Sequence, residues 1–178
     1  MISSYRRIAI DGAQCSGKTT LLGELSRRLG GEYALIPEAA RVIAPQFGVT
    51  SLSDWPRLLE DHQELARFFH EELCWLSVQQ TTSATFLCDS SHFVVEAYRR
   101  TLLGHELPLS DATLSSSYNM VLYCEPVELE SDGFRFFEKR DSVIEQYSQV
   151  LNEAFSGRVE RLLPGPNRCD YVIDLLQI

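Results

Sequence analysis

The sequence predicts a three-layer α/β/α fold built on a five-stranded parallel sheet. Short apolar stretches that are typical of buried strands recur along the chain, and longer stretches with apolar residues at helical spacing lie between them. Such alternation is typical of a parallel sheet that is covered by helices on both faces. Because ligands of these sheets bind at the carboxyl ends of the strands, the residues that follow each strand are candidates for function.

The expected elements follow one another along the whole chain. Strands are predicted at Tyr5–Ile10, Tyr33–Ile36, Thr85–Cys88, Met120–Cys124 and Val159–Leu163. Helices are predicted at Gly17–Leu29, Trp55–Gln80, Phe93–Leu103 and Asp141–Phe155. No repeat, low-complexity segment or Pro- and Gly-rich linker divides the sequence, so residues 1–178 are expected to form a single domain.

Composition narrows the class of protein. The chain has 178 residues, a net charge of −9 and 44% apolar residues, which is ordinary for a globular protein. The negative charge disfavours nucleic acid as a partner, whereas a nucleotide can still bind in a local cationic pocket. No stretch is long and apolar enough to span a membrane, and no signal peptide is evident, so a cytoplasmic location is expected. The cysteines form no C-x-x-C pair, and Cys88 and Cys124 are expected to be buried thiols.

The first strand is followed by a complete phosphate-binding loop. Residues Gly12 to Thr19 read Gly-Ala-Gln-Cys-Ser-Gly-Lys-Thr, which matches the pattern G-x-x-x-x-G-K-[ST]. The two glycines let the backbone wrap around a polyphosphate, Lys18 supplies a positive charge, and the Thr19 hydroxyl can bind Mg²⁺. A P-loop NTPase fold that uses ATP or another NTP with Mg²⁺ is therefore predicted. The expected nucleotide contacts are Gly12, Ala13, Gln14, Cys15, Ser16, Gly17, Lys18, Thr19 and Thr20.

The second strand is followed by an acidic residue and a basic one. Glu38 is placed to face the terminal phosphate region or an acceptor substrate, and Arg41 lies three residues further on. That spacing puts both side chains on one face of a helical turn. Both are predicted to contact substrate; the alternative is a surface ion pair at a helix start.

The third strand is followed by Asp89-Ser90-Ser91-His92. An Asp at this position resembles the second nucleotide-binding motif of phosphate-loop proteins, so Asp89 is expected to hold Mg²⁺ together with Thr19. The alternative is that one of residues 89–91 caps the following helix. His92 is expected to form a local hydrogen bond rather than to act as a base.

A lid is predicted at residues 125–141. Pro126 stops the fourth strand, and Asp132-Gly133 signals a turn. Three cations follow in an otherwise acidic chain: Arg135, Lys139 and Arg140. Placed over a bound nucleotide, they would neutralise charge on the transferring phosphoryl group, with the arginines favoured over the lysine. The alternative is a solvated basic patch.

These features together resemble a known group of proteins. The phosphate loop, Glu38 with Arg41, Asp89, and residues 132–135 (Asp-Gly-Phe-Arg) are similar to small phosphate-loop proteins. That group includes the nicotinamide riboside kinase domain of bacterial NAD-biosynthesis regulators and related AAA-type ATPase-like domains. The same features also resemble the broader nucleoside and nucleotide kinase superfamily. The resemblance covers most of the chain, and it implies an ATP–Mg²⁺ site and a mobile, arginine-rich lid.

The resemblance also suggests which group removes a proton. In deoxynucleoside kinases, a Glu after the second strand acts as a base toward the substrate hydroxyl, and Glu38 matches that position. Those kinases usually carry Asp-Arg-Ser or Glu-Arg-Ser after the third strand. Here Asp89-Ser90-Ser91 lacks the arginine, which weakens the match to deoxynucleoside kinases and leaves Arg41 and the lid to compensate for the missing cation. Asp89 is a second candidate for the base.

Two functions from different classes remain open at this point. The first is transfer of a phosphoryl group from Mg-ATP to the hydroxyl of a small, nucleoside-like molecule, with Lys18, Glu38, Asp89, Arg135 and Arg140 as catalytic residues. The second is a regulatory nucleotide-binding module that hydrolyses NTP slowly or not at all. A guanine-reading N-K-x-D motif is missing, because residues 138–141 read Glu-Lys-Arg-Asp, and this disfavours a GTPase switch.

Overall fold

The sheet has the predicted architecture. The computed structural model describes residues 5–13, 16–48, 68, 72, 84–104, 117–126 and 140–176. Five strands form one parallel sheet in the order β2-β3-β1-β4-β5. Their bounds are β1 Arg7–Asp11, β2 Ala34–Ile36, β3 Phe86–Asp89, β4 Met120–Cys124 and β5 Arg158–Leu162. The strand that leads into the phosphate loop therefore lies in the centre of the sheet, between β3 and β4.

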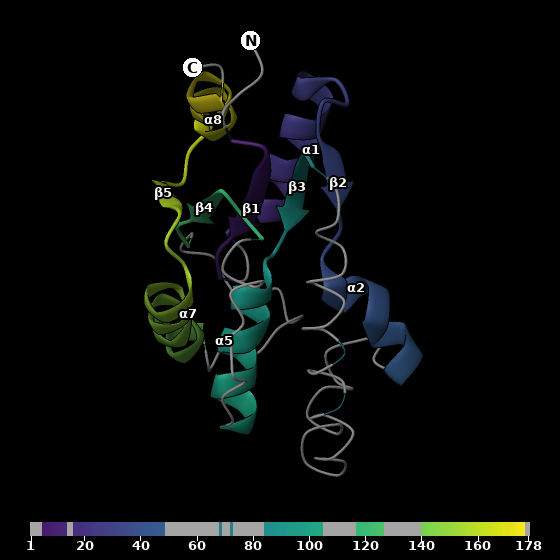
Figure 1. Ribbon diagram of the computed structural model, residues 1–178, viewed down its shortest axis with the longest axis vertical. Coiled ribbons are helices and arrows are strands. Elements are labelled where there is room, and N and C mark those ends of the chain that lie inside the picture. Colours follow the sequence, from purple (N-terminus) through teal and green to yellow (C-terminus); the bar gives the residue numbers. More distant parts are fainter. Residues whose placement is uncertain are drawn as a thin grey trace.

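Helices cover both faces of the sheet. They are α1 Lys18–Leu29, α2 Ala39–Ile43, α5 His92–Leu103, α7 Arg140–Ala154 and α8 Arg168–Leu176, and a short 3₁₀ helix, η1, spans Ala44–Phe47. Figure 1 shows α1 and α8 above the strands and α5 and α7 below them. Within the described ranges, no helix is long and apolar enough to cross a membrane.

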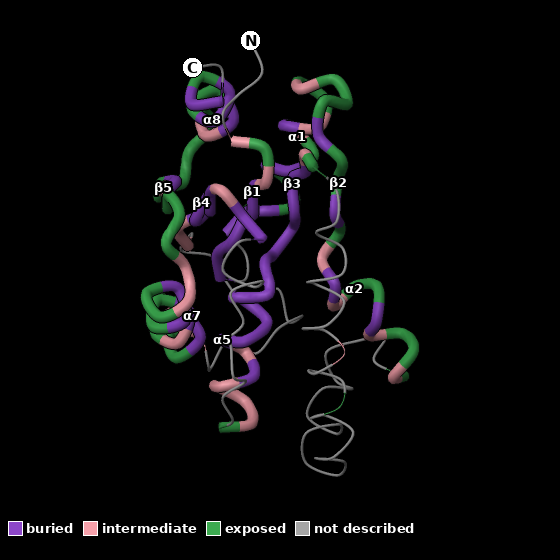
Figure 2. The backbone as a smooth tube through the Cα atoms, in the orientation of Figure 1, coloured by how far each residue is buried: buried purple, intermediate pink, exposed green. Residues whose placement is uncertain are grey.

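Alternation along the strands divides the core between these two faces. Successive strand residues point to opposite faces of a sheet, so neighbours along β1 enter different clusters. Ile8 and Ile10 pack with α1 and α8, whereas Ala9 packs with α5 and α7. Figure 2 shows the result as buried central strands flanked by helices that are exposed on their outer sides. The carboxyl ends of the strands are thus fixed from both sides.

The expected elements agree with the structure to within one or two residues at most boundaries. Strand β4 has the predicted bounds, and Cys88 and Cys124 are buried with free thiols. Helices α2 and α8 were not predicted. The predicted helix Trp55–Gln80 lies outside the described residues except for Phe68 and Glu72, which are both helical.

Candidate active site

The conformation of the phosphate loop depends on its two glycines. Gly12 has a φ of 146°, and a Cβ built on it would lie 2.4 Å from the carbonyl oxygen of Cys124 and 2.8 Å from Ser16 Oγ. Gly17 has a φ of 81° at the N-cap of α1. Both backbone conformations are strained for residues with a side chain. The pattern glycines therefore allow the loop to pass close to the end of β4 and then to turn into α1.

The start of α1 has the features of an anion site. Gly17 provides no side-chain cap, and the first turn contains no acidic residue, so no carboxylate competes for the first N–H groups. Ser16 Oγ is buried without a hydrogen-bond partner in the described part of the chain. Lys18 Nζ donates to the carbonyl oxygens of Gly12 at 2.9 Å and Ala13 at 3.0 Å. The ammonium group therefore lies against the start of the phosphate loop. Gln14 and Cys15 lie outside the described residues.

Thr19 and Asp89 meet where β1 and β3 end. Asp89 is paired with Ile10 in the sheet register, and Thr19 Oγ1 donates to Asp89 Oδ2 at 3.0 Å. The other carboxylate oxygen, Asp89 Oδ1, is buried and has no hydrogen-bond partner among the described residues. A hydroxyl and a carboxylate with a spare buried oxygen are hard oxygen ligands of the kind that Mg²⁺ prefers. These two residues therefore fit the predicted metal role.

The capping alternative does not apply to Asp89. Asp89 is the last residue of β3 rather than the first residue after it. The N-cap of α5 is Ser91, whose side chain accepts a hydrogen bond from the Phe93 N–H at 3.2 Å. The carboxylate of Asp89 is thus left for Thr19 and for a ligand.

Burial and a second carboxylate raise the pKa of Asp89. Asp89 is 3% exposed, so burial is the largest cause, and the charge of Glu38 is the next. The hydrogen bond from Thr19 and the charge of Lys18 act in the opposite direction. A cation bound here would favour the ionised form of Asp89, because it would offset both the burial and the charge of Glu38.

Glu38 and Arg41 lie together, as their spacing predicts. Glu38 is the N-cap residue of α2, and Arg41 Nε donates to Glu38 Oε2 at 3.0 Å. The Glu38 side chain is 23% exposed and that of Arg41 is 57% exposed. Because the charge of Glu38 acts on Asp89, the strand ends of β2 and β3 bring two carboxylates to one region. The geometry contains the ion pair of the alternative interpretation and also leaves Glu38 beside the metal candidate.

The predicted lid, residues 125–141, is described only at its two ends. Arg140 is the first residue of α7, and its charge acts on the Tyr123 hydroxyl near the end of β4. Arg140 therefore lies on the side of the sheet where the strands end. Arg135 and Lys139, with the rest of residues 127–139, lie outside the described residues, and the predicted lid remains a prediction.

His92 differs from its prediction. The side chain is fully buried between aromatic rings, with the ring of Tyr118 stacked at 5.2 Å and that of Phe93 at 4.2 Å. Neither ring nitrogen has a hydrogen-bond partner in the described part of the chain, so the expected local hydrogen bond was wrong. Burial lowers the pKa of His92 to about 4, which keeps the ring neutral near pH 7.

Arg168 is a residue at the site that the sequence analysis missed. At the start of α8, its Nη1 donates to the Ser16 carbonyl at 2.5 Å and its Nη2 to the Leu162 carbonyl at 3.1 Å. Its Nε donates to the Leu163 carbonyl at 3.0 Å, and Nη2 also approaches the Glu125 carbonyl at 3.4 Å. One guanidinium thus ties the phosphate loop to the ends of β4 and β5. The same rule that led to Glu38 and Asp89 would have found it, because Arg168 follows the fifth strand.

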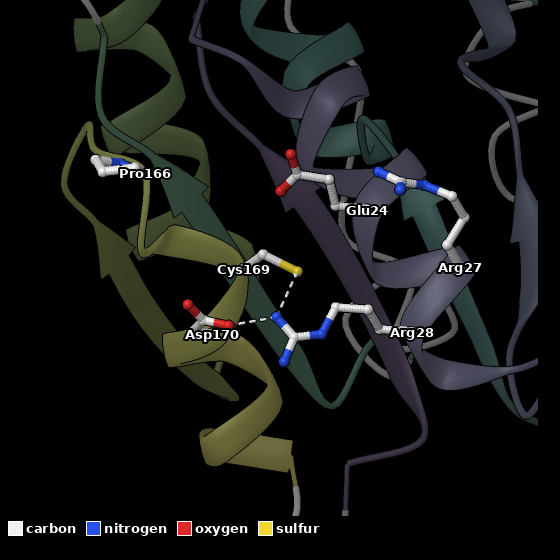
Figure 3. A pocket seen from close by; sticks show the side chains of 6 residues that line it. All are labelled: Glu24, Arg27, Arg28, Pro166, Cys169 and Asp170. Carbon is white, nitrogen blue, oxygen red and sulfur yellow. Dashed lines mark hydrogen bonds and ion pairs between the residues drawn. The ribbon is translucent and has the colours of Figure 1, made fainter.

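A separate hollow of about 190 Å³ lies between α1 and α8. Figure 3 shows Arg28 reaching from α1 to Asp170 and Cys169 at the start of α8, with Glu24 and Arg27 alongside. Arg28 lies ten residues beyond Lys18, which is about 15 Å along the helix. The two arginines that line the hollow are matched by two carboxylates, so the hollow has no excess of either charge. We therefore assign it no part in the candidate site.

Comparison with known proteins places the chain in a family. Residues 7–162 match the AAA domain family, and the chain belongs to that family. A search among curated proteins found no significant match. The narrower resemblance to nicotinamide riboside kinase domains stays a prediction.

Solved structures show the same fold at low sequence identity. A deoxyadenosine kinase from M. mycoides with bound dCTP has a TM-score of 0.67 and 14% identity, over 96% of this chain and 98% of that one. The YorR protein of Bacillus subtilis, in complex with phosphorylated GDP, has a TM-score of 0.61 and 15% identity, over 96% and 95% of the two chains. A thymidylate kinase from Ehrlichia chaffeensis has a TM-score of 0.59 and 17% identity, over 96% and 97%. The chain therefore has the α/β P-loop NTPase fold, which it shares with these structures.

Proposed function

We propose that this chain is a phosphotransferase. It transfers the terminal phosphoryl group of a Mg²⁺-bound nucleoside triphosphate, with ATP as the expected donor, to the hydroxyl of a small, nucleoside-like molecule. The observation that carries the proposal is the juxtaposition of the phosphate loop, the Thr19–Asp89 pair and a second carboxylate, Glu38, at adjacent strand ends. Hydrolysis alone needs no second substrate, whereas a kinase needs a group that addresses the acceptor. The fold shared with nucleoside and nucleotide kinases supports the choice.

The donor half of the site binds and orients the triphosphate. The N–H groups of the phosphate loop and of the first turn of α1 surround the phosphates, and Lys18 supplies a charge to the β- and γ-phosphates. Thr19 and Asp89 would hold the Mg²⁺, whose chemistry there is to neutralise charge on the two terminal phosphates. Positioning and electrostatics of this kind supply most of the catalysis in phosphoryl transfer.

The acceptor half supplies the proton transfer. Glu38 takes the proton of the acceptor hydroxyl while the oxygen of that hydroxyl forms a bond to the γ-phosphorus. The bond between that phosphorus and the β–γ bridging oxygen breaks, and the electron pair leaves with the nucleoside diphosphate. Arg41 orients the Glu38 carboxylate through the 3.0 Å contact. Arg135 and Arg140 are proposed to neutralise the charge that grows on the phosphoryl group.

Aromatic side chains support an acceptor with a flat ring. Phe47 of η1, nine residues after Glu38, is partly buried and lies with its ring 5.9 Å from that of Phe68, which is 51% exposed. The exposed ring of Phe68 offers a stacking surface for a base. A vitamin with an aromatic ring and a free hydroxyl would satisfy the same chemistry, so the acceptor panel includes both classes.

Acceptor dependence separates the kinase from a nucleotide-binding module. ADP release is measured with Mg-ATP and each of a panel of nucleosides, deoxynucleosides and ring-containing vitamins, and the product is identified by mass spectrometry. We expect the amount of ADP formed to equal the amount of phosphorylated acceptor. ADP formation should stop when EDTA replaces Mg²⁺. ADP formation at the same rate with every acceptor and with none would contradict transfer and favour the regulatory module.

A further inference from the structure

A buried carboxylate with no part in the proposed chemistry lies beside the phosphate loop. Asp11 is the last residue of β1, is fully buried, and immediately precedes Gly12. Its Oδ1 accepts the Ser91 N–H at 2.7 Å. Its Oδ2 accepts the Ser91 hydroxyl at 2.5 Å and the Tyr147 hydroxyl at 2.7 Å. A buried carboxylate is unfavourable unless it is hydrogen-bonded, and here three donors satisfy it.

Two of these donors belong to the turn that presents the metal candidate. Ser91 is two residues beyond Asp89, and the residue between them, Ser90, has a φ of 68°. This left-handed conformation is disfavoured for a residue with a side chain. The turn is held by the Ser90 N–H bond to the Ile10 carbonyl at 3.1 Å and by both Ser91 bonds to Asp11. Asp11 therefore fixes the direction in which the chain leaves Asp89.

The third donor ties in α7. Tyr147 is 4% exposed, and its ring is stacked on Tyr123 of β4 with centroids 5.3 Å apart. Its hydroxyl bond to Asp11 joins α7 to the end of β1. Arg140, at the start of the same helix, is two turns away along α7. One carboxylate thus connects the phosphate loop, the turn after β3 and the helix that begins with Arg140.

We propose that Asp11 is a positioning residue that holds Asp89 against Thr19 and so sets how strongly Mg²⁺ promotes nucleotide binding. The inference rests on the proposed use of Thr19 and Asp89 for the metal. Asp11 itself touches neither phosphate nor metal; it acts through Ser91 and the strained turn. A purely structural role would lower thermal stability and leave the Mg²⁺ dependence of nucleotide binding unchanged.

The experiment measures binding of a fluorescent ATP analogue over a range of Mg²⁺ concentrations, alongside thermal unfolding. Asp11→Asn keeps the shape and one acceptor but faces its amide group toward donors. Tyr147→Phe keeps the ring and its stacking and removes one hydrogen bond. The matched control is Tyr33→Phe, which removes the 2.9 Å hydrogen bond from a buried tyrosine hydroxyl to the Tyr5 carbonyl. Both residues precede their strands and so lie away from the carboxyl ends of the sheet.

We expect Asp11→Asn to raise the Mg²⁺ concentration for half-maximal binding about tenfold, and Tyr147→Phe to raise it about threefold, as the loss of buried hydrogen bonds predicts. Binding in EDTA should change less than twofold in both variants. Tyr33→Phe should lower the unfolding temperature without moving the Mg²⁺ midpoint. The double variant should be no worse than Asp11→Asn alone, because both changes break one network.

Two outcomes separate this inference from the proposed function. If Asp11→Asn and Tyr147→Phe lower the unfolding temperature but leave the Mg²⁺ midpoint within twofold, Asp11 is only structural and the inference is wrong. If Asp11→Asn does not fold, Tyr147→Phe alone decides in the same way. If the wild-type protein binds Mg-nucleotide but phosphorylates no acceptor, the transferase proposal fails and the role of Asp11 is still decided by the midpoints.

Discussion

The two carboxylates that face the candidate site are held in very different ways. Asp89 ends a central strand, is 3% exposed and is bonded to Thr19. Glu38 starts a five-residue helix beyond the edge strand β2, and its partner Arg41 has a side chain that is 57% exposed. In the proposed donor half of the site, Asp89 is thus buried and bonded to a residue of α1, whereas the proposed acceptor half rests on a short helix and a partly exposed ion pair.

The difference has a chemical reason. Electrostatic catalysis is strongest where charges are fixed before the substrate arrives, and the triphosphate is the same in every turnover. An exposed ion pair such as Glu38–Arg41 is screened by water and stabilises little, so it can rearrange when an acceptor binds. If the proposed function holds, the donor site is therefore formed before the substrate binds, and the surroundings of Glu38 are the part that can vary with the acceptor.

The largest effect is expected from Lys18→Ala, a substitution in the proposed donor half of the site. Removing the charge that is proposed to meet the β- and γ-phosphates should lower turnover at least about 10³-fold and weaken triphosphate binding. Steady-state ADP release and equilibrium nucleotide binding measure the two losses.

The matched control for Lys18→Ala is Arg27→Ala, a cation on the exposed side of the same helix. It should leave both quantities unchanged. Wild-type turnover in Lys18→Ala would overturn the assignment of the phosphate loop.

Glu38→Gln should separate the two halves kinetically. Loss of a general base typically lowers kcat about 10²- to 10⁴-fold, and the affinity for Mg-ATP should stay within about twofold because Glu38 is proposed to serve the acceptor. Asp89→Asn should instead raise the Mg²⁺ requirement. The two variants are compared by kcat, by nucleotide affinity and by Mg²⁺ titration. Unchanged turnover in Glu38→Gln would make Asp89 the better candidate for the base.

How far the sequence predicts this site follows the same division. The two glycines, Lys18 and Thr19 of the phosphate loop could be located from the sequence because the pattern is local and spans eight consecutive positions. Asp89 could be predicted from its strand. The bonds of Asp11 could not, because its partners Ser91 and Tyr147 are 80 and 136 residues away along the chain. A strand-final Asp says nothing by itself about which donors the fold brings to it.

Two omissions had a signal that went unused. Helix α8 has buried residues at Cys169, Val172, Ile173 and Leu176, which is helical spacing. Arg168 follows the fifth strand, where the strand-end rule points. By contrast, α2 is five residues long, which is too short for a periodic pattern to predict. Long apolar periodicity and strand ends are therefore the two signals that would have improved the prediction.

A smaller effect is expected from Arg168→Ala. The guanidinium holds the phosphate loop through the Ser16 carbonyl and makes three further contacts with the ends of β4 and β5. Its loss should weaken nucleotide binding about tenfold, because the loop is no longer fixed, while the relative rates with different acceptors stay the same. Arg168→Lys should restore little, since an ammonium group cannot reproduce the planar fork. A change in acceptor preference would show that the donor and acceptor halves are not independent.

The smallest effect concerns the thermal stability of the protein, and it tests Asp89 of the proposed donor half without substrate. Burial and the charge of Glu38 raise the pKa of Asp89 above its ordinary value of 3.8, so the folded state binds the proton more tightly than the unfolded state. The stability from this group is fully present below the unfolded pKa and is lost as pH rises through the folded pKa. At pH 7, above the ordinary pKa of this group, Asp89 therefore contributes less to the stability of the nucleotide-free protein than it does at low pH.

Asp89→Asn should then raise the unfolding temperature at pH 7 by about 2 °C, and the difference should shrink toward pH 4. With saturating Mg-ATP the order should reverse, because the wild type gains more binding energy from the bound cation than the variant does. Thermal unfolding at several pH values, with and without Mg-ATP, measures both effects. If the nucleotide-free variant is less stable than the wild type at pH 7, Asp89 stabilises the fold, and the idea that its burial without a cation lowers stability is wrong.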